Sequence, residues 1–319
     1  MVNKTTKKII ITGASSGIGL ALAEHLSSLG HHVIAVARRR EPLETLQKSY
    51  PLNITMVIAD ITKTDERLKI KGELTTEDTG IYLIHNAGIA IPRLLSDISE
   101  TEWEQHYLTN TKAPLFLTQL LLPHLKNGGR VLHISSGLAH TPSSAMVAYG
   151  VSKAALLMSK EYFNAELKQQ GIHCASAMPG VVDTPIQTHL RSCDAKQFPA
   201  VEAFHGFFQR GELLHPRTAA KFLSWLLLHV DDDPFAQGDW NIYDVGHHEY
   251  WAMPGEVKQR KKTAQELTKS QREMPSKASV QSTDYSFYLL CIAGVIAIIV
   301  GSQLISTYFH AENTYSNKP

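Results

Sequence analysis

The chain of 319 residues is long enough for one large domain or two ordinary ones, and 43% of its residues are hydrophobic. Because 19% are charged and the formal net charge is only +1, no strong field favours nucleic acid as a partner. The cysteines Cys174, Cys193 and Cys291 lack metal-ligand spacing, which indicates a reduced, cytosol-facing protein. The polar first residues lead directly into an apolar run, so we expect no secretory signal peptide.

From residue 7 onward, short β-branched apolar runs alternate with longer segments of helical period. Strands are predicted at residues 8–12, 32–37, 54–59, 81–85, 130–135, 173–178 and 239–243. Helices are predicted at residues 17–29, 42–49, 101–124 and 148–169. This alternation is typical of a parallel sheet with helices on both faces. We therefore predict an α/β fold, a doubly wound parallel sheet of the Rossmann type, in a single domain over residues 1–251.

The composition changes at about residue 252. Residues 252–284 are rich in lysine and arginine and are interpreted as a basic linker, or alternatively as a surface helix. Residues 285–309 contain no charged residue, and a helix of roughly 20 such residues spans a bilayer core of about 30 Å. We predict a C-terminal transmembrane helix there, followed by a short tail at residues 310–319. The alternative is a helix buried in the domain or at a dimer contact.

Aromatic residues lie at both ends of the apolar run, namely Tyr285, Tyr288, Tyr308 and Phe309. Together with the lysine and arginine excess on the N-terminal side, they predict a single-pass tail anchor in a membrane, with the catalytic domain facing the cytosol. Ala293, Ala297 and Gly301 recur at a spacing of four, which would let two such helices approach closely. We expect a homodimer or a higher homo-oligomer.

A glycine loop follows the first predicted strand and opens the first predicted helix. Residues 12–19 read TGASSGIG, and the glycines permit a tight turn and the close approach of a pyrophosphate to the helix N-terminus. The alternative is a turn that serves packing only. The expected cofactor contacts in this loop are Gly13, Ser15, Ser16, Gly17, Ile18 and Gly19.

The GxxxGxG spacing of this loop resembles that of the classical short-chain dehydrogenases, and further motifs extend the resemblance across about residues 7–245. The family implies a Rossmann-type domain that binds a nicotinamide dinucleotide. Asp60 and Ile61, after the third strand, resemble the site that bonds the adenine ring. The turn of Asn86, Ala87 and Gly88 resembles the family's NNAG turn, with His85 in place of the first asparagine, and His85 is interpreted as structural.

The residues after the second strand bear on the choice of cofactor. An NAD enzyme usually places an acid here to bind the ribose hydroxyls, whereas this chain has Arg38, Arg39 and Arg40. An arginine pairs bidentately with a 2′-phosphate, so Arg38 and Arg39 favour NADP(H). The alternative is that these arginines only solvate the start of the next helix.

Tyr149 and Lys153 lie four residues apart and therefore on one face of a predicted helix. The ammonium favours the phenolate, so we expect a lowered tyrosine pKa and proton exchange nearer neutrality. Ser136 closes a strand and precedes Tyr149 by the family's interval, which disfavours the adjacent Ser135; the resemblance implies that its hydroxyl binds the substrate oxygen. By the same resemblance, Asn110 completes the tetrad and binds the water through which the lysine reaches solvent.

After the sixth strand, Pro179, Gly180, Val182 and Thr184 resemble the family's PG motif, in which backbone and hydroxyl hold the nicotinamide carboxamide. Within the family, three stretches resemble the sepiapterin reductase and benzil reductase group, namely residues 178–191, Phe198-Pro199 and residues 211–220. Residues 186–208 are predicted to form a lid. Its phenylalanines, Phe198, Phe204, Phe207 and Phe208, indicate an apolar or aromatic carbonyl substrate, or else ordinary core.

The sequence thus predicts an NADP(H)-dependent carbonyl reductase, or alcohol dehydrogenase, acting on a small-molecule ketone or dicarbonyl. Two alternatives remain: a membrane-tethered reductase of a lipid ketone, and a non-catalytic NADP-binding membrane adaptor. The intact set of Ser136, Tyr149, Lys153 and Asn110 disfavours the adaptor, which would need no proton relay. The chain's 16 histidines show no spaced metal-ligand motif, so no catalytic metal is expected.

Overall fold

The computed structural model describes residues 6–253, which contain a seven-stranded parallel sheet in the order β3-β2-β1-β4-β5-β6-β7. The strands are β1 (Lys8–Thr12), β2 (His32–Ala37), β3 (Ile54–Ile58), β4 (Tyr82–His85), β5 (Gly129–Ile134), β6 (Ile172–Met178) and β7 (Asp239–Asn241). Each predicted strand is confirmed, with ends that move by at most two residues. The order reverses between β1 and β4, which is where doubly wound folds bind their ligands.

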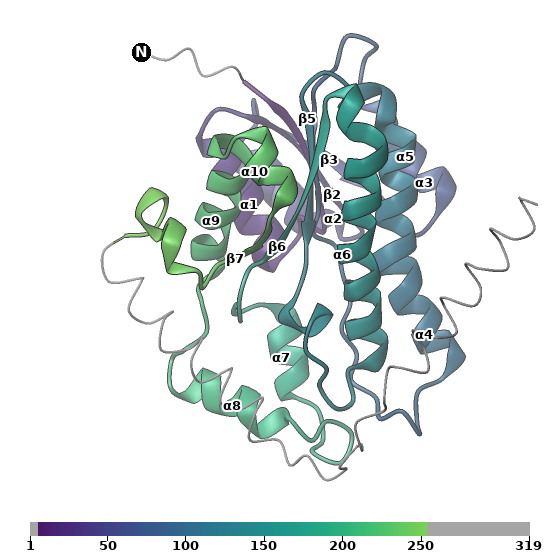
Figure 1. Cartoon of the computed structure of the whole chain (residues 1–319), viewed down its shortest axis with the longest axis vertical. Helices are drawn as coiled ribbons and strands as arrows, with labels where there is room; N and C mark the ends of the chain where they lie inside the picture. The colour runs from purple at the N-terminus through teal and green to yellow at the C-terminus, as the bar shows by residue number, and fades with distance from the viewer. Residues whose placement is uncertain (1–5, 254–319) are drawn as a thin grey trace, which may run out of the picture. The chain divides into compact units, whose positions relative to one another are not determined.

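Helices cover both faces of the sheet (Figure 1). One face carries α1 (Gly17–Ser28), α2 (Arg40–Ser49) and α9 (Pro216–His229). The other carries α3 (Thr64–Gly72), α5 (Ala113–Leu125) and α6 (Val147–Leu167). Because strand side chains alternate between faces, a run such as Ile9-Ile10-Ile11 supplies both layers of the core.

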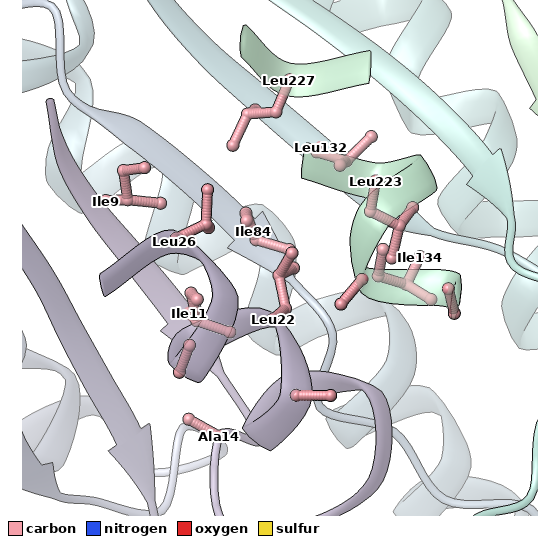
Figure 2. Packing of buried hydrophobic residues seen from close by; sticks show 14 of the residues in the cluster. Ile9, Ile11, Ala14, Leu22, Leu26, Ile84, Leu132, Ile134, Leu223 and Leu227 are labelled. Atoms are coloured by element: carbon pink, nitrogen blue, oxygen red, sulfur yellow. The ribbon is translucent and has the colours of Figure 1, made fainter. Parts of the chain in front are cut away.

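The packing of α1 and α9 on the central strands is shown in Figure 2. Leu22 and Leu26 of α1 lie four residues apart and pack beside Leu223 and Leu227 of α9, and all four are fully buried. Burying one such leucine stabilises the fold by about 1.5–3 kcal/mol. This packing holds β1, which leads into the glycine loop, and β5, which leads to Ser136, firmly against α1 and α9.

The helical layer departs from the sequence prediction in two respects. The predicted helix at residues 101–124 is divided into α4 (Glu100–Tyr107), a π-helical turn at Leu108–Lys112 and α5. Several helices were not predicted: α3, α7 (Pro185–Arg191), α8 (Val201–Gln209), α9 and α10 (Asp232–Gln237). The shortest of these have too few turns for a clear hydrophobic period, and α7 and α8 lie together at the lower end of the view in Figure 1.

The last described segment packs on α9 through aromatic rings. In the 3₁₀ helix Val245–Tyr250, His247 stacks on Phe222 and Trp225 with ring centroids 5.2 Å apart in each case, and it accepts a hydrogen bond from Trp251. The predicted linker after residue 253, the predicted transmembrane helix at 285–309 and the tail at 310–319 lie outside the described residues. Within residues 6–253, no helix combines the length and the apolar character needed to cross a membrane.

Candidate active site

The glycine loop between β1 and α1 packs directly on the turn after β4. Gly13 and Gly17 have φ values of +72° and +55°, the left-handed region that favours glycine. A Cβ atom on Gly13 would lie 2.8 Å from Cα of Ala87, and one on Gly19 would collide with the Asn86 side chain. Glycine is therefore required here for close backbone approach, as a loop that cradles a pyrophosphate needs.

Thr12 and Asn86 hold this loop in place. The Thr12 hydroxyl accepts hydrogen bonds from the backbone N–H groups of Asn86 and Ala87, both at 3.1 Å, and donates to the carbonyl of Ile84. The Asn86 side-chain amide donates to the carbonyl of Thr12 at 2.9 Å. Thr12 was not among the predicted site residues, although it stands in the TGASSGIG motif. It braces the predicted cofactor loop against β4.

The arginines after β2 approach the glycine loop. The guanidinium of Arg39 donates to the carbonyl of Ser15 at 3.1 Å and to its hydroxyl at 3.0 Å. Arg38 is exposed, and its positive charge acts on Asp60 after β3. The structure thus brings together predicted cofactor residues that follow three adjacent strands.

Asp60 is held as a carboxylate at the end of β3. One of its oxygens accepts hydrogen bonds from the backbone N–H and the hydroxyl of Thr62. Burial raises the pKa of Asp60, but these hydrogen bonds and the charges of Arg38 and Lys63 outweigh burial and lower it overall. The neighbouring Ile61 is buried.

The segment after β6 meets the glycine loop from the other side. A Cβ atom on Gly17 would lie 3.0 Å from the methyl group of Thr184, and both residues line an open groove of about 790 Å³. Pro179 and Gly180 follow β6, and Val182 forms a β-bridge with Leu214. This groove is lined by residues of the predicted cofactor loop and not by Ser136, Tyr149 or Lys153.

Tyr243 packs against the loop after β6 and is hydrogen-bonded to it. Its hydroxyl accepts a hydrogen bond from the N–H of Val181 at 3.0 Å, and it would lie 2.8 Å from a Cβ atom on Gly180. Gly180 has a φ of +84° and needs to be glycine for this contact. No local sequence pattern indicated Tyr243, because the two segments lie more than 60 residues apart.

Ser136, Tyr149 and Lys153 meet at the carboxyl end of β5. Tyr149 and Lys153 lie on the sheet-facing side of α6, where the Lys153 ammonium donates to the carbonyl of Ile134 at 2.7 Å and lies 5.9 Å from the Tyr149 ring centre. Ser136 follows β5 and is hydrogen-bonded to Tyr149 through its side chain. The Ser135 hydroxyl, in contrast, has no partner among the described residues. The choice of Ser136 over Ser135 as the catalytic serine stays a prediction.

The expected lowering of the Tyr149 pKa is wrong for this structure. Burial raises the pKa of Tyr149, and the hydrogen bond with Ser136 only partly opposes that effect. Burial also lowers the pKa of Lys153 to about 8. Desolvation of the phenol is the largest cause of the shift in the Tyr149 pKa, so burial and not the neighbouring ammonium sets its direction.

Asn110 sits in the π-helical turn between α4 and α5. It is fully buried, and its side chain accepts from the N–H of Ile89 and donates to the Ile89 carbonyl and to the Ser152 hydroxyl, each at 2.9 Å. A Cβ atom on Gly88 would lie 3.2 Å from the Asn110 oxygen and 3.6 Å from the Lys153 nitrogen. Asn110, Gly88 and Lys153 therefore converge, and π-turns of this kind are frequent at functional sites.

An apolar cluster from the predicted lid packs against Tyr149. It includes Leu190 of α7, the fully buried Phe198 and, at its margin, Phe204 of α8. Phe207 is also buried, whereas Phe208 is exposed beneath the Arg191 guanidinium. Of the two alternatives for these aromatic side chains, Phe198 fits core, and Phe204 is partly buried against the same cluster.

Within the described part of the chain, no group of three or more potential metal ligands is close enough to hold an ion.

A family model described as "short chain dehydrogenase" matches residues 7–195. An uncharacterized oxidoreductase of Schizosaccharomyces pombe is 34% identical over 241 residues, covering 72% of this chain and 94% of that protein. A benzil reductase ((S)-benzoin forming) of Bacillus subtilis is 31% identical over 242 residues, covering 74% and 97%. A short-chain dehydrogenase/reductase structure from Saccharomyces cerevisiae matches with a TM-score of 0.72 and 27% identity, covering 77% of this chain and 99% of that one.

Proposed function

This chain belongs to the short-chain dehydrogenase family and is an oxidoreductase, and from that premise we propose that it is an NADP(H)-dependent carbonyl reductase. The observation that carries the proposal is the convergence of Ser136, Tyr149 and Lys153 at the end of β5. Bound nicotinamide would supply the hydride. The protein must then supply a proton and a hydrogen bond to the carbonyl oxygen.

These side chains can meet both needs. The Tyr149 hydroxyl is protonated at neutral pH, as any phenol with a pKa of about 10 is, and burial raises its pKa further. It donates its proton to the oxygen as the carbonyl becomes an alcohol. The Ser136 hydroxyl, beside it, holds the same oxygen by a hydrogen bond. Lys153 stabilises the phenolate that remains. Asn110, next to the lysine, holds the Ile89 backbone and the Ser152 hydroxyl in place by hydrogen bonds.

NADP(H) is favoured as the cofactor by Arg38 and Arg39. Arg39 is already oriented toward Ser15, and Arg38 is exposed, so a 2′-phosphate could lie between the ends of β1 and β2 and accept hydrogen bonds from both. Residues of the glycine loop, including Ser16 and Ile18, and the backbone near Asn86 would hold the rest of the dinucleotide. Thr184 and Val182 would hold its carboxamide.

For the substrate, we propose an apolar or aromatic ketone or dicarbonyl. The apolar cluster against Tyr149 supports this, and so does the similarity to a protein named benzil reductase. The test is NADPH oxidation by the full-length chain with an aromatic 1,2-dicarbonyl. Tyr149→Phe should lower kcat by about 10²–10⁴-fold and leave NADPH affinity within about twofold. Full activity of Tyr149→Phe would refute the mechanism.

We also propose that residues 285–309 anchor the enzyme in a membrane with the domain facing the cytosol, because this run is uncharged and long enough to span a bilayer. The anchor favours a lipid ketone as the second candidate substrate. Deleting residues 285–319 should move the protein from the membrane to the soluble fraction and leave turnover of a soluble dicarbonyl unchanged. Full-length protein in the soluble fraction would contradict the anchor.

A homodimer is our proposal for the assembly. Exposed apolar side chains gather on α4 and α6, which pack together, and they include Tyr107, Met158 and Tyr162. Met158→Glu should therefore yield monomers in sedimentation analysis, whereas Leu52→Glu, at an exposed position outside α4 and α6, should not. An unchanged mass for Met158→Glu would exclude this face.

A further inference from the structure

A row of polar residues crosses half of the sheet beneath α6. His85 of β4, His133 of β5, Ser176 of β6 and Asp239 of β7 are directly paired from strand to strand. Directly paired residues of parallel strands point to the same face. That face is the one covered by α5 and α6, since Cys174, two residues before Ser176, packs in the cluster with the α5 leucines.

Three of the seven side-chain nitrogen and oxygen atoms of this row lack a partner among the described residues. Of the others, Nε2 of His85 lies 2.8 Å from the Thr118 hydroxyl. The buried atoms without a hydrogen bond among the described residues are Nδ1 of His85, Oγ of Ser176 and Oδ1 of Asp239, together with Oγ of Ser135 on the same face. His133 differs, because Nδ1 lies 3.1 Å from the Leu156 carbonyl and Nε2 faces the Cys174 sulfur at 3.8 Å. Buried polar atoms that lack protein partners are usually satisfied by ordered water.

The row has a catalytic end and a solvent end. At one end, the Lys153 ammonium donates to the carbonyl of Ile134, the residue between His133 and Ser135. An ammonium has three N–H donors, so two remain for other partners. At the other end, Oδ2 of Asp239 lies 2.6 Å from Nε2 of His140, whose side chain is 44% exposed.

We propose that bound water molecules fill this row and form a proton path from the His140–Asp239 pair to Lys153. Adjacent strands lie about 4.8 Å apart, so one water with two hydrogen bonds of about 2.8 Å spans the step from Asp239 to Ser176. Ser135 lies two residues beyond His133, the register partner of Ser176, so this diagonal step of about 8 Å takes two waters. Water and the hydroxyls of Ser135 and Ser176 both donate and accept, so they can pass a proton along. His133, with both nitrogens engaged, borders the path and takes no part in it.

The catalytic use of the proton path rests on the proposed function, whereas the presence of the bound waters does not. Each reduction consumes one proton in addition to the hydride. Tyr149 gives its O–H proton to the alcohol, Lys153 returns a proton to the phenolate and becomes an amine, and a solvent proton entering at His140 and Asp239 restores the ammonium. This route leaves the sheet toward β7, away from Asn110.

A high-resolution crystal structure of the full-length chain tests the waters without reference to activity. We expect water within about 3 Å of Ser176 Oγ and Asp239 Oδ1, and water against Ser135 Oγ. The absence of ordered water from this row, between the sheet and α6, would overturn the proposal even if the enzyme were fully active. Conversely, an active Tyr149→Phe would refute the proposed function while the waters remained in place.

Ser176→Ala tests the path itself. We expect kcat for the dicarbonyl to fall by about fivefold and the solvent deuterium isotope effect on kcat to rise, because proton resupply becomes slower. The matched control is Ser27→Ala, which removes another buried hydroxyl without a partner, on α1 at the opposite face. If Ser176→Ala fails to fold, Asp239→Asn keeps the side-chain size and should show the same change. An unchanged rate and isotope effect in a folded variant would overturn the path.

Discussion

The Lys153 ammonium is hydrogen-bonded to the carbonyl oxygen of Ile134 at 2.7 Å, two residues before Ser136. This bond ties α6 to the end of β5, so the helix that carries Tyr149 and the strand that leads to Ser136 are positioned by one contact. It also keeps Lys153 buried, and burial lowers the lysine pKa from 10.5 to about 8.

The lowered pKa predicts the pH dependence of reduction. Activity should fall above about pH 8, because Lys153 then loses the proton that it returns to Tyr149, whose own pKa is raised by burial. The measurement is kcat against pH from about 6 to 10. Constant activity up to pH 10 would mean that Lys153 does not supply the proton.

Unfolding does not account for such a decline. Between about pH 8 and 10.5 the unfolded chain holds more protons on Lys153 than the folded chain does, so the contribution of this group to the free energy of unfolding rises with pH. A circular dichroism melt at the highest pH is the control.

Arg38 should decide between the two nicotinamide cofactors. Arg38→Asp should weaken NADPH binding by about 10–100-fold, the value of a charge-assisted hydrogen bond, and should leave NADH binding nearly unchanged. The matched control is Arg40→Asp, because Arg40 pairs with Glu44 on the same helix. Equal losses for both cofactors, measured by fluorescence titration, would exclude a phosphate contact.

Gly19→Ala should both destabilise the domain and abolish cofactor binding. The added Cβ would collide with the Asn86 side chain and the Gly13 carbonyl, which cannot both move without opening the loop. We expect a loss of about 1–3 kcal/mol in the free energy of unfolding. Gly72→Ala is the control, since no atom lies within 4 Å of its added Cβ. Equal urea midpoints for the two variants would show that the glycine loop can rearrange to accept the added Cβ atom.

Arg130 should contribute to the free energy of unfolding and have no effect on turnover. Its buried guanidinium donates to the Leu227 carbonyl at 2.9 Å and to the Asp232 carboxylate at 2.6 Å, and it lies 4.8 Å from the Phe235 ring centre. Arg130→Met should cost about 1–3 kcal/mol in the free energy of unfolding, because the buried Leu227 carbonyl loses its donor. Lys168→Met, which breaks an exposed pair with Asp233, should leave the urea midpoint unchanged. Equal shifts of the urea midpoint in the two variants would contradict the expectation that the buried contacts of Arg130 stabilise the fold more than an exposed ion pair does.

The sequence was sufficient for features that depend on neighbouring residues. Short β-branched apolar runs such as Ile9-Ile10-Ile11 located the strands, and the glycine loop and the spacing of Tyr149 and Lys153 located the candidate site. Short helices such as α7 were missed, because the contacts that stabilise them lie elsewhere in the chain. The boundary in the predicted helix at 101–124 was missed for a related reason, since Asn110 bonds to Ile89 and Ser152 and not within its own helix.

Only the tertiary structure decided what depends on burial and on pairing between distant segments. Adjacent spacing predicted a lowered Tyr149 pKa, but desolvation of the buried phenol raised it, and desolvation cannot be computed from spacing alone. The bracing of the glycine loop by Asn86 and the alignment of His85, His133, Ser176 and Asp239 follow from strand register. Register is set by contacts across the sheet, so residues more than 150 positions apart can share one row.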